Sequence, residues 1–193
     1  MKRRIMRRKV FLILAAVCLT FTVSIAFASD KHKEGRGKVR SMAAKNLSRL
    51  YEVRPSAKAG IESAAGYGVF SNFGMKILVA GGGKGNGVVV NNRTKQETFM
   101  KMAEVQAGLG FGVKKFSVIF VYEQEQALNN FIDQGWEFGG QATAAATVKD
   151  KGASFAGAVS VSPGVWMYQL TETGIAAEIT GKGTKYYKDK KMN

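Results

Sequence analysis

The spacing of apolar residues changes from a helical period to an alternating one near Gly66. Residues 38–53 carry Val, Met, Ala, Leu and Tyr on one half of a helical wheel and mostly Lys, Arg, Ser and Glu on the other half. Pro55 stops this helix, Ser56 can cap a second short helix over residues 57–65, and Gly66 ends it. The pattern therefore predicts two successive helices, the first of them amphipathic.

After Gly66, apolar and polar residues alternate in short runs separated by turn residues, which is typical of half-buried strands. A helical stripe returns over residues 123–134 and ends at Gly135. Turns are expected between residues 73 and 75, at 91–94 and at Lys114-Lys115. The predicted strand segments are 67–73, 75–80, 88–92, 105–113, 116–122, 143–148, 153–161, 165–170 and 174–180.

These elements predict an α+β fold. Helices that lie mainly towards the N-terminus, followed by hairpin-connected strands, indicate an antiparallel sheet and not a parallel doubly wound one. Six to eight antiparallel strands and two or three helices are expected. Small residues throughout the strands favour tight curvature, so we expect a curved antiparallel β-sheet or a partly closed barrel.

The glycine-rich stretch VAGGGKGNGVVV at residues 79–90 invites comparison with phosphate-binding loops. A Walker A loop needs Ser or Thr after its lysine to bind magnesium, whereas Gly85 follows Lys84. The glycine spacing also fails the dinucleotide-binding fingerprint. Three valines follow, and they favour a strand over the helix N-terminus that holds a phosphate. We therefore expect a glycine hairpin or a bulged strand pair, with Lys84 as a surface charge.

The first 28 residues have the pattern of a signal peptide, because six Lys and Arg residues precede an apolar run from Val10 to Ala28. The run ends in Ala26-Phe27-Ala28, a small-x-small site for signal peptidase. An uncleaved membrane anchor is the alternative, since 19 apolar positions can span a bilayer. The favoured organisation is a signal peptide over 1–28, a flexible leader over 29–37 and a single domain over 38–193.

Without the signal peptide, 23 Lys and Arg remain against 14 Asp and Glu, a net charge of +9. Such a surplus favours anionic surfaces, although it also keeps a Gly- and Ala-rich domain soluble. The only cysteine, Cys18, lies in the removed segment, and the only histidine, His32, lies in the polar leader. No thiol nucleophile or metal-ligand cluster remains, so the sequence predicts no catalytic residue, no metal and no cofactor.

The basic amphipathic helix over residues 38–53 is the main candidate binding site. An interfacial helix has an apolar half bordered by cations, and Lys38, Arg40, Lys45 and Arg49 fit this pattern. The apolar half can instead pack on the sheet and leave these cations solvated. The basic tail over 182–191 is a second candidate, with a solvated last strand as its structural alternative.

In order and spacing, the segments resemble the SYLF domain family, the lipid-binding domain also found in yeast and animal actin-patch regulators. The resemblance covers about Lys45 to Asn193. Gln169 stands where the family usually has a serine, and Gln96-Glu97-Thr98-Phe99 lacks a tryptophan that commonly follows the glycine stretch. The matching segments are AAGYGVF (64–70), GGGKGNGVVV (81–90), AGLGFG (107–112), ALNNF (127–131), GW (135–136), YQLTETG (168–174) and KYY (185–187).

The resemblance implies lipid association and no catalytic residue set. The actin-binding and phosphoinositide roles of eukaryotic members are not expected for a chain that is predicted to be exported from a bacterium. We expect an exported, periplasmic or secreted, non-enzymatic protein that binds anionic phospholipid or a membrane surface, and no nucleic acid. The binding residues predicted are Lys38, Arg40, Lys45, Arg49 and Lys84. The alternative is a periplasmic protein-interaction or envelope-structural module without a lipid ligand.

Overall fold

The computed structural model describes residues 32–77, 80–107, 112–138, 155–171, 174–175 and 183–193. Residues 38–191 together with Asn193 form one compact unit, and residues 1–37 together with Met192 form another. The larger unit contains the whole sheet. The predicted signal peptide and the first three residues of the predicted leader lie outside the described residues.

Three helices are present in the described residues. The N-terminal helix spans residues 32–53, so helical structure begins within the segment that was expected to be a flexible leader. The two glycines of that segment suggested flexibility, but a glycine inside a helix costs only about 1 kcal/mol relative to alanine. The second helix, α2 (Ser56–Ser63), follows Pro55, and the third, α3 (Glu125–Gln134), ends at Gly135, whose φ is 70°.

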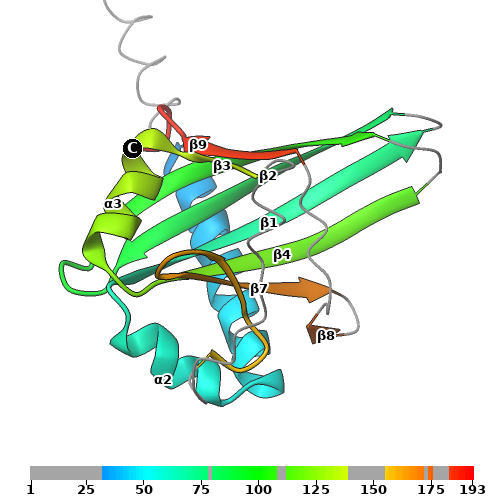
Figure 1. The fold of residues 1–193 in the computed structure, drawn as a ribbon. Coiled ribbons are helices and arrows are strands. Elements are labelled where there is room, and N and C mark those ends of the chain that lie inside the picture. The colour runs from blue at the N-terminus through cyan, green and yellow to red at the C-terminus, as the bar shows by residue number, and fades with distance from the viewer. Residues whose placement is uncertain (1–31, 78–79, 108–111, 139–154, 172–173, 176–182) are drawn as a thin grey trace, which may run out of the picture. The chain divides into compact units, whose positions relative to one another are not determined.

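One antiparallel sheet contains the described strands, in the order β5-β9-β3-β2-β1-β4-β7-β6, with β8 paired to β7. Four long strands, β1 to β4, lie side by side at its centre (Figure 1). The predicted α+β class and curved antiparallel sheet are confirmed. The strand bounds are β1 (Gly66–Ile77), β2 (Ala80–Asn91), β3 (Glu97–Ala107), β4 (Gly112–Tyr122), β5 (Trp136–Phe138), β6 (Val159–Ser162), β7 (Val165–Thr171), β8 (Gly174–Ile175) and β9 (Thr184–Lys188).

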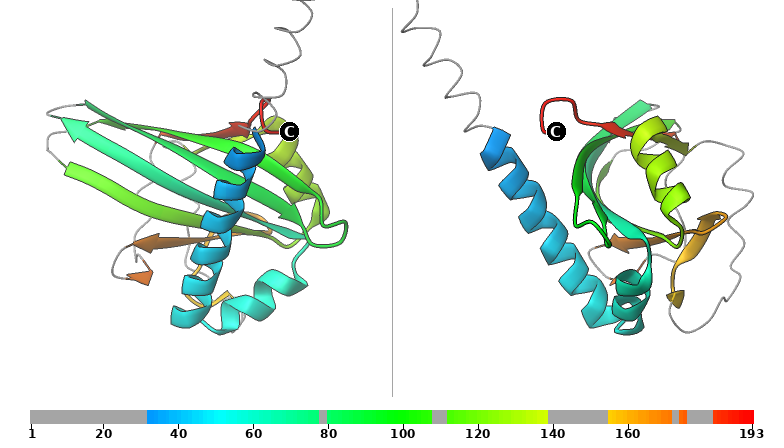
Figure 2. Two further views of the ribbon diagram at one scale, coloured as in Figure 1. Left: turned by 180° about the vertical axis from the view of Figure 1, so that it is seen from behind. Right: turned by 90° about the vertical axis from the view of Figure 1, so that its left-hand side faces the viewer.

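The sheet curls around α3, which lies on its inner face, while residues 38–53 of the N-terminal helix lie on its outer face (Figure 2, right). Aromatic rings fill the inner face. The centroid of the Phe70 ring lies 4.8 Å from that of Tyr186 and 5.9 Å from that of Phe120. Phe131 of α3 joins this group, with its ring centroid 5.4 Å from that of Phe120. The inner core is therefore built from edge-to-face and tilted aromatic contacts.

The glycine-rich stretch is a strand and not the expected hairpin, because it forms β2 and pairs in continuous register with β1 and β3. Two other predicted turns were also wrong. β1 runs unbroken through residues 73–75, and Lys114-Lys115 lie inside β4. Hydrogen bonds to neighbouring strands on both sides outweigh the low strand propensity of glycine, a tertiary effect that local patterns do not contain.

Gly83, Gly85 and Gly87 face the inner side of the sheet, where they leave room for side chains of β1. Gly87 lies opposite Phe70 in the register. A Cβ atom at Gly87 would lie 2.2 Å from Cδ1 of Phe70 and 2.5 Å from the carbonyl oxygen of Val69. The missing side chain therefore lets the Phe70 ring lie across β2 and reach the aromatic core.

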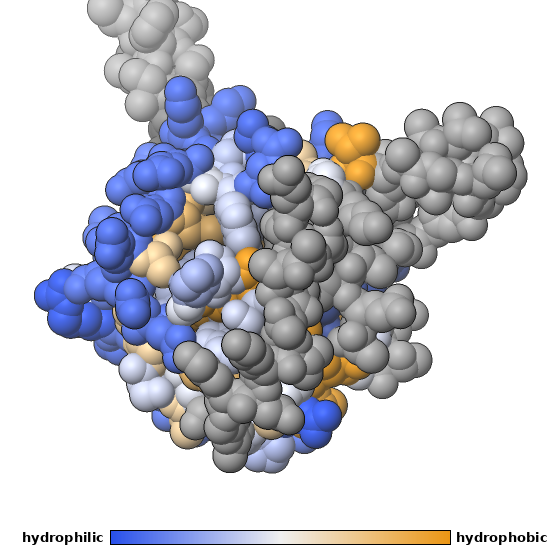
Figure 3. Space-filling view, viewed as in Figure 1, coloured by the Kyte–Doolittle hydropathy of each residue, from blue (hydrophilic) through white to orange (hydrophobic). Residues whose placement is uncertain are grey.

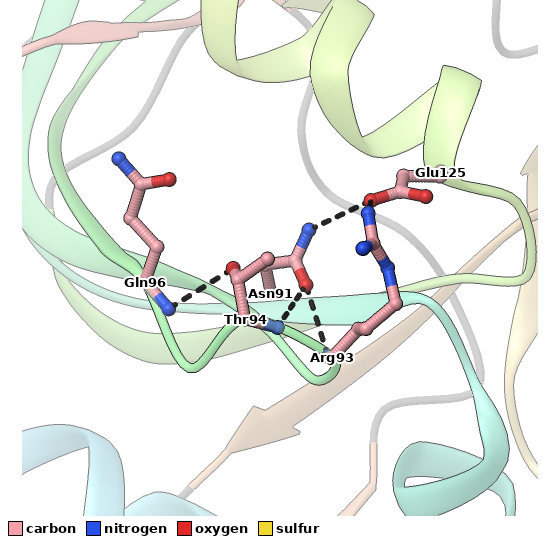
Figure 4. A network of polar contacts seen from close by, with 5 residues as sticks. All are labelled: Asn91, Arg93, Thr94, Gln96 and Glu125. Atoms are coloured by element: carbon pink, nitrogen blue, oxygen red, sulfur yellow. Dashed lines mark hydrogen bonds and ion pairs between the residues drawn. The ribbon is translucent and has the colours of Figure 1, made fainter.

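The turn between β2 and β3 is connected to α3 by polar contacts (Figure 4). The Asn91 side chain accepts hydrogen bonds from the backbone N–H groups of Arg93 and Thr94, both at 2.9 Å. Its amide nitrogen donates to Glu125 at 3.3 Å. Arg93 donates to the same carboxylate and forms an ion pair with it, and this hydrogen bond lowers the pKa of Glu125.

We predict that Gly87→Ala lowers the free energy of unfolding by about 2–3 kcal/mol or more, because the new methyl group overlaps a buried ring. Gly82→Ala is the matched control on the same strand. A Cβ there would meet only the carbonyl oxygen of Glu104 at 3.6 Å, an ordinary contact. Urea unfolding of both variants measures the difference, and equal stabilities would contradict the close-packing argument.

We also predict that Asn92→Ala destabilises the protein by about 1–3 kcal/mol. The Asn92 amide donates to the carbonyl oxygens of Ile61, at 2.6 Å, and Ala64, at 2.9 Å. These carbonyls lie at the end of α2, where the last C=O groups of a helix have no N–H donor within the helix. Arg93→Ala in the same turn should have a much smaller effect, because exposed ion pairs are screened by solvent. Thermal and urea unfolding of the two variants test this comparison. A larger loss of stability in Arg93→Ala than in Asn92→Ala would show that the ion pair, and not the Asn92 amide, stabilises the turn.

Candidate functional site

The apolar half of the N-terminal helix is occupied by packing on the outer face of the sheet. Val39, Ala43 and Leu50 are 5%, 6% and 0% exposed. The sequence left two interpretations open for this apolar half, insertion into a membrane interface or packing on the sheet. In the structure it packs on the sheet. Any contact of this helix with a ligand must use the side chains that point away from the sheet.

Arg40, one of the predicted binding residues, is engaged by β3. Its Nε donates to the two carboxylate oxygens of Glu97 at 3.1 and 2.8 Å, and its Nη2 lies 2.7 Å from one of them. Its Cζ lies 5.3 Å from the centroid of the Phe99 ring, in a cation–π contact. The hydrogen bond to Glu97 raises the pKa of Arg40. The charge of Arg40 is thus already paired, although its side chain stays half-exposed.

The other predicted cations of this helix divide into two kinds. Arg49 donates a hydrogen bond to the carbonyl oxygen of Thr171, at the end of β7. Lys38 and Lys45 are exposed at the helix surface. The structure therefore does not gather the four predicted cations of the helix at one point, because two of them attach the helix to strands far apart in the sheet.

Lys84 belongs to a row of lysines that crosses the outer face. Lys185 of β9 pairs with Ala103 of β3, which in turn pairs with Lys84 of β2. On the other side, Lys84 pairs with Phe73 of β1, which pairs with Lys115 of β4. Neighbouring strands lie about 4.8 Å apart, so successive lysines in the row are separated by about 10 Å at the backbone. Lys84, Lys115 and Lys185, all exposed, are called the lysine row.

Two exposed apolar side chains adjoin the lysine row. Val105 is 69% exposed and Tyr187 is 41% exposed. Val105 lies two residues after Ala103 on β3, and Tyr187 lies two residues after Lys185 on β9. Residues two apart on a strand point to the same side, so both side chains share the outer face with the lysine row. Lys101 pairs with the buried carboxylate of Asp189 at 3.1 Å. The N-terminal helix crosses this face near one end of β1–β4 and leaves their other ends extending beyond it (Figure 2, left).

A pocket of about 350 Å³ lies between α3 and the turn that joins β6 to β7. Hydrophilic residues gather over α3 on this side of the molecule (Figure 3). The pocket has an aromatic base formed by Tyr122, Phe131 and Trp136. Burial raises the pKa of Tyr122 well above its ordinary value. The rest of the lining consists of Gln124, Gln126, Ala127, Asn130, Gln134, Gly135, Ser162, Pro163 and Val165.

A buried polar pair lies on the inner face away from this pocket. Asn72 and Glu104 are 2% and 3% exposed, and the Asn72 amide donates to the Glu104 carboxylate. Gly83 makes space for this amide, since a Cβ there would lie 2.7 Å from its oxygen. Burial, and then the charge of Glu104, raise the pKa of Tyr186. This pair supports the interior of the curled sheet.

Among the described residues, His, Cys, Asp and Glu side chains form no group of three that could hold a metal ion. The same part of the chain has no helix with the length and apolar character needed to cross a membrane. Two acidic residues were considered as catalytic candidates from the sequence. Glu123 lies just before α3 and Glu125 is its first residue, and negative charge is favourable at a helix N-terminus. Glu125 is engaged by Arg93 and Asn91.

Sequence reasoning did not find the pocket or the whole lysine row. Lys115 was placed in a turn, and Lys185 was included only in the basic tail. The amide-rich run QEQALNNFIDQ over residues 124–134 was the available signal for the pocket, because it places five Gln and Asn side chains in or next to one helix. Its partner, the turn between β6 and β7, comes about 30 residues later and could not be placed from local patterns.

Two comparisons with known proteins gave matches. Residues 103–193 match the family model Ysc84, described as "Las17-binding protein actin regulator". The chain is also 31% identical over 167 residues to "Beta cell expansion factor A" of Aeromonas veronii. This match covers 83% of the chain and 59% of that relative, so the chain spans less than two thirds of the relative's length. The C-terminal part of the chain, residues 103–193, is therefore similar to the Ysc84, or SYLF, family.

Proposed function

We propose that this protein is an exported, non-enzymatic SYLF-family domain that binds anionic lipid surfaces through the outer face of its sheet. The observation that carries the proposal is the lysine row lying beside exposed Val105 and Tyr187. A lysine near an anionic bilayer contributes about 1 kcal/mol of attraction. Exposed apolar side chains beside such cations can enter the interface between headgroups and acyl chains.

The N-terminal helix has a secondary role in this proposal. It lies on the same outer face, where Lys38 and Lys45 are exposed and add to the positive charge. Arg40 and Arg49 hold the helix on the sheet through Glu97 and Thr171. The site is therefore a sheet surface supported by the helix, and the helix does not need to leave the sheet for the protein to bind.

The similarity to the Ysc84 family supports a lipid-binding or actin-regulator-like domain in general terms. The predicted signal peptide supports export to the periplasm or beyond. After cleavage the chain has a net charge of +9, which favours association with an anionic membrane leaflet there. The second candidate is a protein-interaction module, favoured by the family description, which names a protein partner. An acidic envelope protein would meet the same lysine row.

The test is co-sedimentation with vesicles of phosphatidylcholine that do or do not contain phosphatidylglycerol. We expect binding to the anionic vesicles at low salt, and loss of binding as salt screens the charges. Lys84→Glu, Lys115→Glu and Lys185→Glu combined should weaken binding about a hundredfold or more, at about 1 kcal/mol per lysine.

The control combines Lys58→Glu, Lys95→Glu and Lys190→Glu, which changes the net charge equally at exposed positions outside the row. The control should retain most of the binding. Equal loss in both triple variants would show that net charge alone is responsible. Absence of binding to anionic vesicles at low salt, together with recovery of one stoichiometric envelope protein, would replace the lipid proposal with the protein-partner one.

A further inference from the structure

The pocket between α3 and the β6–β7 turn has a chemical character different from that of the lysine row. Its rim is formed by amide side chains, and its base is formed by aromatic rings. Gln126, Asn130 and Gln134 follow one another at i, i+4 and i+8, so they form one stripe along α3. Ala127 and Phe131 form the apolar stripe beside it, which faces the core.

The amide stripe offers unused hydrogen-bonding groups. Each amide side chain has one acceptor oxygen and two N–H donors. In the described part of the chain, the side chains of Gln124, Gln126, Asn130 and Gln134 make no hydrogen bond, and all four are exposed. Four such groups around one pocket can donate to and accept from several hydroxyl groups at once.

The base of the pocket is rigid and aromatic. Phe131 and Tyr122 are 4% and 0% exposed, and their ring centroids lie 5.2 Å apart. Trp136 is only partly buried, and its ring centroid lies 6.1 Å from that of Phe131. The three rings belong to β4, α3 and β5, so the sheet and the helix fix their relative positions. They present an apolar surface below a polar rim.

The described residues of the pocket lining include no charged side chain, which argues against a charged ligand. Among the described lining residues there is no Lys, Arg or His to pair with a phosphate or carboxylate, and no Asp or Glu to pair with a cation. A purely apolar ligand such as an acyl chain would remove water from the rim amides without replacing its hydrogen bonds, which is unfavourable. The volume of about 350 Å³ lies at the lower end of the range for small-molecule sites.

We propose that this pocket binds a neutral pyranose ring, either as a free saccharide or as the headgroup of a neutral glycolipid. A pyranose has hydroxyl groups around its edge and an apolar C–H face, which match the amide rim and the aromatic base. Ser162 adds a hydroxyl group from the β6–β7 turn, and Pro163 closes the rim opposite α3. The site is independent of the lysine row, so the two proposals can fail separately.

Titration of the purified protein with methyl glycosides of glucose, galactose, mannose and N-acetylglucosamine tests the free-saccharide source. We expect at least one glycoside to bind with millimolar or lower Kd and to shift the indole NMR signal of Trp136. Trp166, which is 4% exposed and stacks on Phe155 outside the pocket, is the internal reference and should not shift. Vesicles of phosphatidylcholine with or without monogalactosyl diacylglycerol test the glycolipid source.

Asn130→Ala and the double variant Gln126→Ala, Gln134→Ala should each weaken saccharide or glycolipid binding about tenfold or more. Asn129→Ala is the matched control, since Asn129 is an exposed amide on the same helix that does not line the pocket. All these positions are exposed, so thermal unfolding should remain unchanged. Binding in neither arm, or binding that the Asn129 and Asn130 variants weaken equally, would overturn the proposal.

Discussion

The contact of the Phe70 ring with the glycine face of β2 is the constraint on which the inner core depends. Phe70 reaches Tyr186 on β9, Phe120 on β4 and Phe131 on α3, so one side chain joins three parts of the fold. It can do so only because Gly87 has no side chain between the strands. The packing of α3 on the inner face uses this aromatic group, because Phe131 contacts Phe70 and Phe120, and the pocket lies beside α3.

The two faces of the sheet separate two kinds of chemistry. The outer face carries exposed lysines and two exposed apolar side chains, and it suits a broad anionic surface. The inner face carries aromatic rings, and where it opens beside α3 it is rimmed by neutral amides. Because successive residues of a strand point in opposite directions, a single strand contributes to both. In β4, for example, Lys115 belongs to one face and Phe116 to the other.

The sequence was most informative where a residue type has a strong local structural preference, such as Pro and Gly at helix ends. Pro55 and Gly135 placed the ends of helices correctly, and Asn91-Asn92-Arg93-Thr94 placed the turn after β2. The bounds of α2 were less accurate, because it begins at Ser56, the residue expected to cap it, and ends at Ser63, before Gly66. It was misleading in the glycine stretch, where pairing with strands on both sides decided the conformation. Glycine is common in turns, and no local pattern shows that Phe70 and Asn72 will lie over these positions.

The candidate sites were harder to predict because their members come from distant segments. Lys84 was found, but its neighbours in the row come from β4 and β9 and depend on strand order. Arg40 and Arg49 fitted a lipid-binding pattern by type and spacing, but Glu97 and Thr171 engage them in the folded protein. The amphipathic pattern of a helix shows that one face will be covered and does not show by what.

The position of β9 has a consequence for biogenesis. Residues 184–188 lie between β3 and β5 in the sheet, although they follow every other strand in the chain. Tyr186 from this strand also completes the aromatic core. The sheet therefore cannot close during translation until those residues have left the ribosome. Until β9 has been synthesised, β3 and β5 lack their shared partner strand and the aromatic core lacks Tyr186, so the completion of both is a late step in folding.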